Sequence, residues 1–119
     1  MILVADGDTA FLEKARMILN RERQVLLAST AAQAFALAEN LGIAVALVNL
    51  DLPGNGLELI ERLQSSDPDL PIIAISSTFD QAAIANVKSL GVTEVLQKPI
   101  TPAWKPVVEA LRSQRRRHQ

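Results

Sequence analysis

Five short apolar runs alternate along this chain with segments whose apolar residues recur at helical spacing. The runs cover residues 2–5, 25–28, 44–50, 72–75 and 95–97. Strands that are apolar throughout are typical of a parallel sheet buried on both faces, and parallel neighbours need crossover connections, usually helices. The alternation therefore predicts an α/β domain with five parallel strands and five helices.

The ends of the expected helices are marked by capping and helix-breaking residues. We expect Thr9 to cap the first helix, Ser29 or Thr30 to begin the second, and Gly42 to end it in a left-handed conformation. Turn or breaker residues bound the third and fourth helices, at 53–56, 67–69, Asp80 and Gly91, and Pro106 places the start of the fifth near Lys105. With right-handed crossovers, the expected architecture is a flavodoxin-like (βα)5 fold with strand order 2-1-3-4-5 and helices on both faces.

Composition limits the kind of protein this can be. The chain has 119 residues, 49% of them hydrophobic, which suits one compact domain. It has no cysteine, so disulfides and thiolate chemistry are excluded. Its apolar runs, such as residues 43–50, are far shorter than the roughly 20 residues of a membrane helix, and the first residues do not resemble a signal peptide. We therefore expect a cytoplasmic location.

Charge is distributed unevenly along the chain. Residues 1–111 carry 8 basic and 13 acidic side chains, a net charge of -5, whereas residues 112–119 carry four arginines, a net charge of +4. We expect a domain over residues 1–112 and, over 113–119, a basic tail or the start of a linker. The acidic body argues against direct nucleic-acid binding, except through an output domain outside this sequence.

Polar residues end four of the five expected strands. They are Asp6 with Asp8, then Asn49, Ser76 and Lys98. Ligand sites of open α/β sheets lie at the carboxyl ends of the strands, so these side chains are the candidate site.

At these positions the sequence resembles the receiver domain of two-component response regulators. The resemblance rests on four motifs in the family's order, and it covers essentially the whole chain: Asp6-Gly7-Asp8, Asn49 before Leu52-Pro53-Gly54, Ser76, and Lys98-Pro99. In that family an acidic pair and an acceptor aspartate hold Mg²⁺, and the aspartate takes the phosphoryl group. The resemblance further implies a hydroxyl and a lysine on the phosphoryl oxygens and a switch aromatic on the last strand.

Four features depart from the family pattern. Asn49 stands at the acceptor position and Gly7 at that of the second acidic residue. The turn at residues 53–56 is one residue shorter than usual, and Val95 stands where the switch aromatic is expected. An amide is a poor nucleophile and a weaker Mg²⁺ ligand than a carboxylate. We therefore expect a degenerate pseudo-receiver that is not an enzyme, uses no cofactor and binds Mg²⁺ weakly or not at all.

The remaining site residues have structural interpretations. Asp6 and Asp8 would belong to a loop that caps the first helix, and Lys98 would pair with Asp6 and hold the first and fifth strands together. Pro99 would have a structural role, following a cis peptide bond as the resemblance implies. Val95 and Trp104 are candidate interface residues.

Three functions remain open from the sequence. The first is a phosphorylation-independent signalling module that binds a protein partner, a fused output domain or a second copy of itself. The second is a phosphorelay receiver with an unusual acceptor, Asp8 or Asp51. The third is a small-molecule-binding flavodoxin-like domain, although no glycine-rich phosphate loop supports it. A serine hydrolase built on Ser76 is excluded, because the only histidine is His118.

Overall fold

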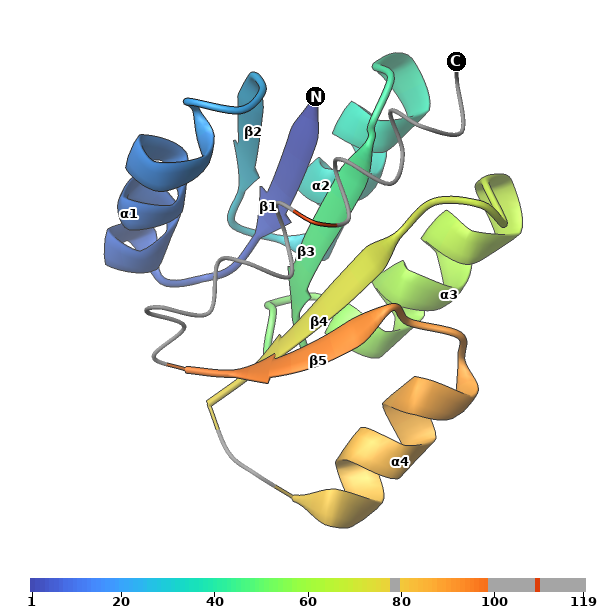
Figure 1. Ribbon diagram of the computed structural model, residues 1–119. Helices are drawn as coiled ribbons and strands as arrows, with labels where there is room; N and C mark the ends of the chain where they lie inside the picture. Colours follow the sequence, from blue (N-terminus) through green and yellow to red (C-terminus); the bar gives the residue numbers. More distant parts are fainter. Residues whose placement is uncertain (78–79, 99–108, 110–119) are drawn as a thin grey trace.

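The computed structural model describes residues 1–77, 80–98 and 109 of the chain. Strands and helices alternate along it, as Figure 1 shows: β1 (Ile2–Ala5), α1 (Thr9–Leu19), β2 (Val25–Ala28), α2 (Ala31–Asn40), β3 (Val45–Asn49), α3 (Gly56–Ser66), β4 (Ile72–Ser76), α4 (Gln81–Ser89) and β5 (Glu94–Gln97). The expected fifth helix near Lys105, Pro99, Trp104 and the basic tail lie outside the described residues.

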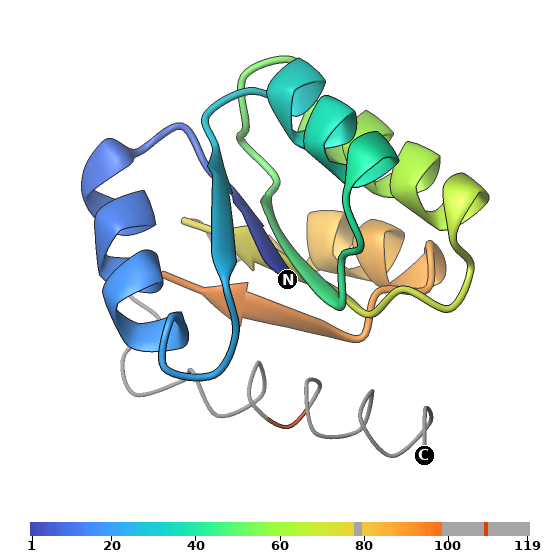
Figure 2. The same cartoon turned by 90° about the horizontal axis from the view of Figure 1, so that it is seen from above.

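The five strands form one parallel sheet in the order β2-β1-β3-β4-β5, which confirms the predicted topology. In Figure 2, helix α1 lies on one face of the sheet and helices α2, α3 and α4 lie on the other. The order reverses between β1 and β3, the strands that carry Asp6 and Asn49 at or beyond their carboxyl ends. This switch point is where open α/β sheets form their ligand crevices.

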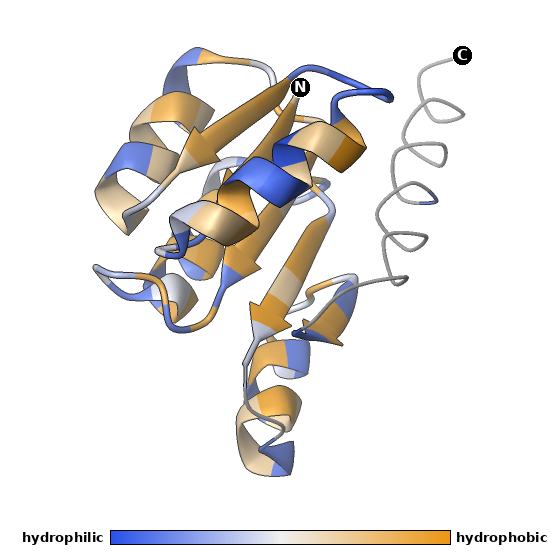
Figure 3. Ribbon diagram, turned by 90° about the vertical axis from the view of Figure 1, so that its left-hand side faces the viewer, coloured by the Kyte–Doolittle hydropathy of each residue, from blue (hydrophilic) through white to orange (hydrophobic). Residues whose placement is uncertain are grey.

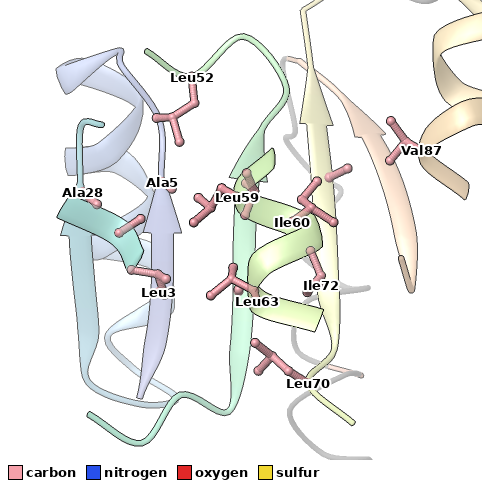
Figure 4. Packing of buried hydrophobic residues seen from close by; sticks show 14 residues of the cluster. Leu3, Ala5, Ala28, Leu52, Leu59, Ile60, Leu63, Leu70, Ile72 and Val87 are labelled. Atoms are coloured by element: carbon pink, nitrogen blue, oxygen red, sulfur yellow. The ribbon is translucent and has the colours of Figure 1, made fainter. Parts of the chain in front are cut away.

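The hydrophobic core has two parts because successive residues of each strand point to opposite faces of the sheet. One part joins α1 to alternate strand residues such as Ile2, Val4, Leu47 and Ile73. Figure 4 shows the other part, in which Leu3, Ile60, Leu63 and Ile72 lie among residues from several elements. Figure 3 shows the strands as predominantly apolar ribbons between helices with mixed faces. The three central strands, β1, β3 and β4, are therefore buried on both faces of the sheet.

Two predicted helix caps are wrong. Asp8, not Thr9, is the N-cap of α1, because its side chain accepts hydrogen bonds from the N–H groups of Ala10 and Phe11. Helix α2 ends at Asn40, and its C-cap Leu41 has an extended backbone (φ -132°, ψ 151°). Gly42 does not have a positive φ, so it does not cap the helix in a left-handed conformation. The predicted caps of the other helices agree with the structure: Thr30 and Asp80 are N-caps, and Gly91, with φ of 91°, follows α4.

No helix within the described residues is long and apolar enough to cross a membrane.

Candidate functional site

The predicted site residues come together at the carboxyl edge of the sheet. Asp6, Asn49 and Ser76 are the three polar side chains that the described part of the chain buries, with exposed fractions of 1%, 6% and 7%. Because burying polar groups costs free energy unless they are hydrogen-bonded, their partners decide what this cluster can do.

Asp6 and Lys98 form an ion pair across the edge of the sheet. The Lys98 Nζ atom lies 2.8 Å from Oδ2 of Asp6, and the lysine side chain is only 19% exposed. The same ammonium lies 4.3 Å from the centroid of the Phe11 ring on α1, within the range of a cation–π contact. The backbone N–H of Lys98 donates to the carbonyl of Ser76, which continues the β4–β5 pairing. Lys98 thus joins β5 to the end of β1 and to α1.

Asn49 forms a hydrogen bond to the same carboxylate. Its Nδ2 donates to Oδ2 of Asp6 over 3.0 Å, and its Oδ1 accepts from the N–H of Asp51 over 2.8 Å. This orientation of the amide gives each of its two ends a complementary partner, whereas the flipped orientation would place an oxygen against a carboxylate. The amide is therefore held in place between a carboxylate and a backbone N–H.

Asp8 is turned toward the first helix. Its backbone N–H donates to Oδ1 of Asp6 over 2.8 Å, while its own carboxylate caps α1. A carboxylate at a helix N-terminus is favoured by the helix dipole as well as by the hydrogen bonds. Asp6 consequently accepts bonds on both carboxylate oxygens, from Asp8, Asn49 and Lys98.

Asp51 has a partner that the sequence did not indicate. Its Oδ2 accepts from the hydroxyl of Ser77 over 3.1 Å, and both residues are exposed. This bond connects the loop after β3 to the residue after β4. The sequence motif singles out Ser76, and only the three-dimensional fold shows that Ser77 lies beside Asp51.

Val95 does not lie in the buried polar cluster. It is partly buried on β5, opposite Ala74 in the sheet, and packs against the part of the core that contains α4. Within the described residues, no three histidine, cysteine, aspartate or glutamate side chains gather in a group that could hold a metal ion.

A cavity lies away from this edge of the sheet. A cavity of about 220 Å³ opens between the C-terminal ends of α2 and α3, with Phe35, Leu41, Leu63 and Leu70 among its lining residues. Leu70 precedes β4, so this cavity lies toward the amino ends of the strands, away from the buried polar cluster. It contains none of the predicted site residues.

The family assignment follows from residues 2–104, which match the model of the response regulator receiver domain. The chain belongs to this family. The match includes every described residue of the polar cluster as well as Pro99 and Trp104.

Two relatives are named as regulators, one of the photosynthetic apparatus and one of hydrogenase transcription. The chain is 33% identical over 100 residues to the photosynthetic apparatus regulatory protein RegA of Rhodobacter capsulatus, covering 82% of this chain and 54% of RegA. It is 31% identical over 103 residues to the hydrogenase transcriptional regulatory protein HoxA of Cupriavidus necator, covering 85% of this chain and 21% of HoxA. The chain thus spans about half or less of these relatives' length.

Solved structures agree with the fold. A CheY-like receiver domain protein from Methanospirillum hungatei superimposes with a TM-score of 0.89 at 28% identity, covering 98% of this chain and 96% of that one. A response regulator from Burkholderia pseudomallei has a TM-score of 0.76 at 28% identity, covering 82% of this chain and 59% of the other. The latter structure contains a phosphorylated aspartic acid and a calcium ion.

Proposed function

We propose that this receiver domain signals through protein contacts without accepting a phosphoryl group. The observation that carries the proposal is the hydrogen bond from Asn49 Nδ2 to Asp6 Oδ2, with Asn49 at the family's acceptor position. Receiver signalling is a property of the family to which the chain belongs, and the loss of phosphorylation is the part that we infer from these residues.

The chemistry of the acceptor side chain is the first argument. An acyl phosphate forms when an anionic carboxylate oxygen attacks phosphorus and the other phosphoryl oxygens are stabilised by cations. The amide of Asn49 has a delocalised nitrogen lone pair and an oxygen without a full charge. That oxygen also accepts a hydrogen bond from the backbone N–H of Asp51, which occupies one of its lone pairs. Asn49 is therefore unsuited to nucleophilic attack.

The charge balance of the cluster is the second argument. The carboxylate of Asp6 is neutralised by Lys98, and the amide of Asn49 adds a donor without adding charge. An aspartate at position 49 would instead bring two carboxylate oxygens to about 3 Å from one another, an arrangement that requires a cation or a proton between them. The cluster as it stands is balanced by the chain's own side chains.

The carboxylates that could replace the acceptor have other partners. Asp8 caps α1, and Asp51 accepts from Ser77 on the exposed side of the loop. Using either as a nucleophile would break those bonds, and no observation favours the phosphorelay alternative. The cavity between α2 and α3 contains no described site residue, so nothing specific favours a small-molecule function either.

The partner that we propose is a protein. It is an output domain in a longer chain, as the greater length of RegA and HoxA suggests, or a separate protein, or a second copy. Strand β5 with Val95, together with Trp104, is the proposed contact region. In this arrangement the domain contributes a fixed binding surface, and no catalytic step is required of it.

A phosphoryl mimic tests the proposal directly. Beryllofluoride with Mg²⁺ is added to ¹⁵N-labelled protein, and the amide resonances of Asp8, Asp51 and Lys98 are followed. We expect no saturable shifts, because the cluster has no acceptor carboxylate. Saturable shifts at these three amides would contradict the proposal.

A further inference from the structure

The loop between β3 and α3 contains two consecutive residues with positive φ. Gly54 and Asn55 are consecutive residues with φ of 91° and 80°, and Asn55 is the only non-glycine residue with positive φ in the described part of the chain. Side chains other than glycine rarely adopt this region, although asparagine tolerates it. Asn55 is held there by its role as N-cap, accepting from the N–H of Glu58 over 3.2 Å. The chain thus reaches α3 through two successive left-handed residues.

This loop presses against the end of β3 and against the loop after β1. A Cβ atom on Gly56 would lie 2.4 Å from the carbonyl oxygen of Asn49, so the first turn of α3 sits directly on the strand end. A Cβ atom on Gly7 would lie 3.0 Å from Cδ and 3.3 Å from Cγ of Pro53. Any side chain at position 7 would therefore require the Pro53 ring to move by a few tenths of an ångström.

Pro53 is anchored on its other side, which limits that movement. Its carbonyl accepts from the N–H of Ala31 at the start of α2 over 2.9 Å. Leu52 beside it is 3% exposed, and its N–H donates to the carbonyl of Asn49. The carbonyl of Leu52 in turn accepts from Asn55. The loop is held at β3, at α2 and in the core, so Pro53 cannot shift without disturbing these contacts.

The residues of this cluster do not fit the Mg²⁺ ion that the family implies. Magnesium requires a near-octahedral shell of oxygen ligands. Gly7 provides no side-chain oxygen, Asn49 turns its N–H₂ group toward Asp6, and the ammonium of Lys98 lies on the same carboxylate oxygen. The remaining ligand is the carboxylate of Asp6, whose oxygens already make three hydrogen-bond or ion-pair contacts.

We infer that the short β3–α3 loop itself closes this site to divalent cations, by holding Pro53 against position 7. Glycine at position 7 suits this loop, because the Cβ atom of any other residue would have to displace the Pro53 ring. The inference rests on the proposed function and deepens it: restoring the two carboxylates alone would not restore a cation site. Pro53 is the residue that keeps divalent cations out of the site.

The test compares two carboxylate-restored proteins that differ only in the loop. The first carries Gly7→Asp and Asn49→Asp, and the second carries the same changes plus one glycine inserted between Gly54 and Asn55. Mg²⁺ binding to each is measured by isothermal titration calorimetry. We expect the lengthened loop to bind Mg²⁺ at least roughly tenfold more tightly, and equal affinity in the two proteins would overturn the inference.

A second measurement, which needs no metal, tests the inference even if the variant with the inserted glycine misfolds. In the native loop, Gly7→Ala should lower the melting temperature, whereas in a Pro53→Ala background the same change should have a clearly smaller effect, since the ring that it meets is gone. Equal effects in the two backgrounds would overturn the inference. Failure here leaves the proposed function standing, because that is refuted only by a phosphoryl group or its mimic on the unmodified chain.

Discussion

Asn49 donates a buried hydrogen bond from Nδ2 to Oδ2 of Asp6, 43 residues earlier in the chain, over 3.0 Å. The bond joins β3 to the end of β1 at the point where the strand order of the sheet reverses. In a receiver with an acceptor aspartate, two carboxylates would face each other at this point. Here a neutral amide donates to one carboxylate instead. The stability of the cluster should therefore depend on a donor at position 49.

Replacing Asn49 by aspartate should destabilise the protein in a pH-dependent way. At neutral pH we expect a loss of about 2–4 kcal/mol, because two carboxylates then face each other in a buried site. Acid should reduce the loss, since a proton bound between the carboxylates restores a donor across the contact. Urea unfolding at pH 7 and near pH 5 measures the difference.

Asn49→Ala provides the control for that experiment. It removes the hydrogen bond without adding charge, and we expect a loss of about 1–2 kcal/mol that changes little with pH relative to the unmodified protein. If Asn49→Asp were as stable as the unmodified protein at pH 7, the charge argument would be wrong.

Removing Lys98 should weaken the fold far more than removing a surface cation. Lys98→Met leaves Asp6, which is 1% exposed, without its ion-pair partner, and we expect a loss of about 2–3 kcal/mol. Arg16→Met is the matched control, because its pair with Glu13 is more than half exposed and should contribute less than about 1 kcal/mol. Equal losses by denaturant unfolding would show that the buried pair has no special role.

Alanine substitutions at Gly56 and Gly42 should have very different effects on stability. Gly56→Ala places a methyl group 2.4 Å from the carbonyl of Asn49, and we expect a loss of about 2–3 kcal/mol or more. Gly42→Ala meets nothing within 4 Å and should stay within about 0.5 kcal/mol of the unmodified protein. Thermal unfolding of the two variants checks this, and a tolerated Gly56→Ala would show that α3 can move away from β3.

The cap of α1 can be checked in the same way. Asp8→Ala should cost about 1 kcal/mol, because Ala10 and Phe11 lose their acceptor. Thr9→Ala, one residue later, should cost much less, since the hydroxyl of Thr9 caps nothing. The reverse order of stabilities would restore the sequence-based expectation that Thr9 is the cap.

The sequence predicted the fold well because its signals are of kinds that tertiary contacts rarely override. Uniformly apolar runs such as Ile2–Ala5 require burial on both faces, and the helical segments between them provide the crossovers of a parallel sheet. The order β2-β1-β3-β4-β5 was expected as the flavodoxin-like arrangement of such a sheet, and the structure has it. The helix caps were harder to assign from the sequence. Asp8 and Thr9 are adjacent and both are good N-caps, and only the backbone geometry separates them.

The sequence predicted the residues of the candidate cluster and the ion pair between Asp6 and Lys98, but not the contacts made by the loops around it. The carboxyl ends of parallel strands meet at one edge, so the proximity of Asp6, Asn49 and Lys98 follows from topology. The pairing of Ser77 with Asp51 and the contact of Pro53 with Gly7 depend on loop conformations that no periodic pattern encodes. These loop contacts are where the structure adds to the functional argument.

The most direct test of the central claim is the intact mass of the protein after incubation with acetyl phosphate and Mg²⁺. A phosphoryl group adds about 80 Da, and receivers with an acceptor aspartate in a working pocket should acquire it under these conditions. We expect the unmodified chain to keep its original mass. A stoichiometric phosphoryl adduct on Asp8, Asp51 or any other aspartate would contradict it.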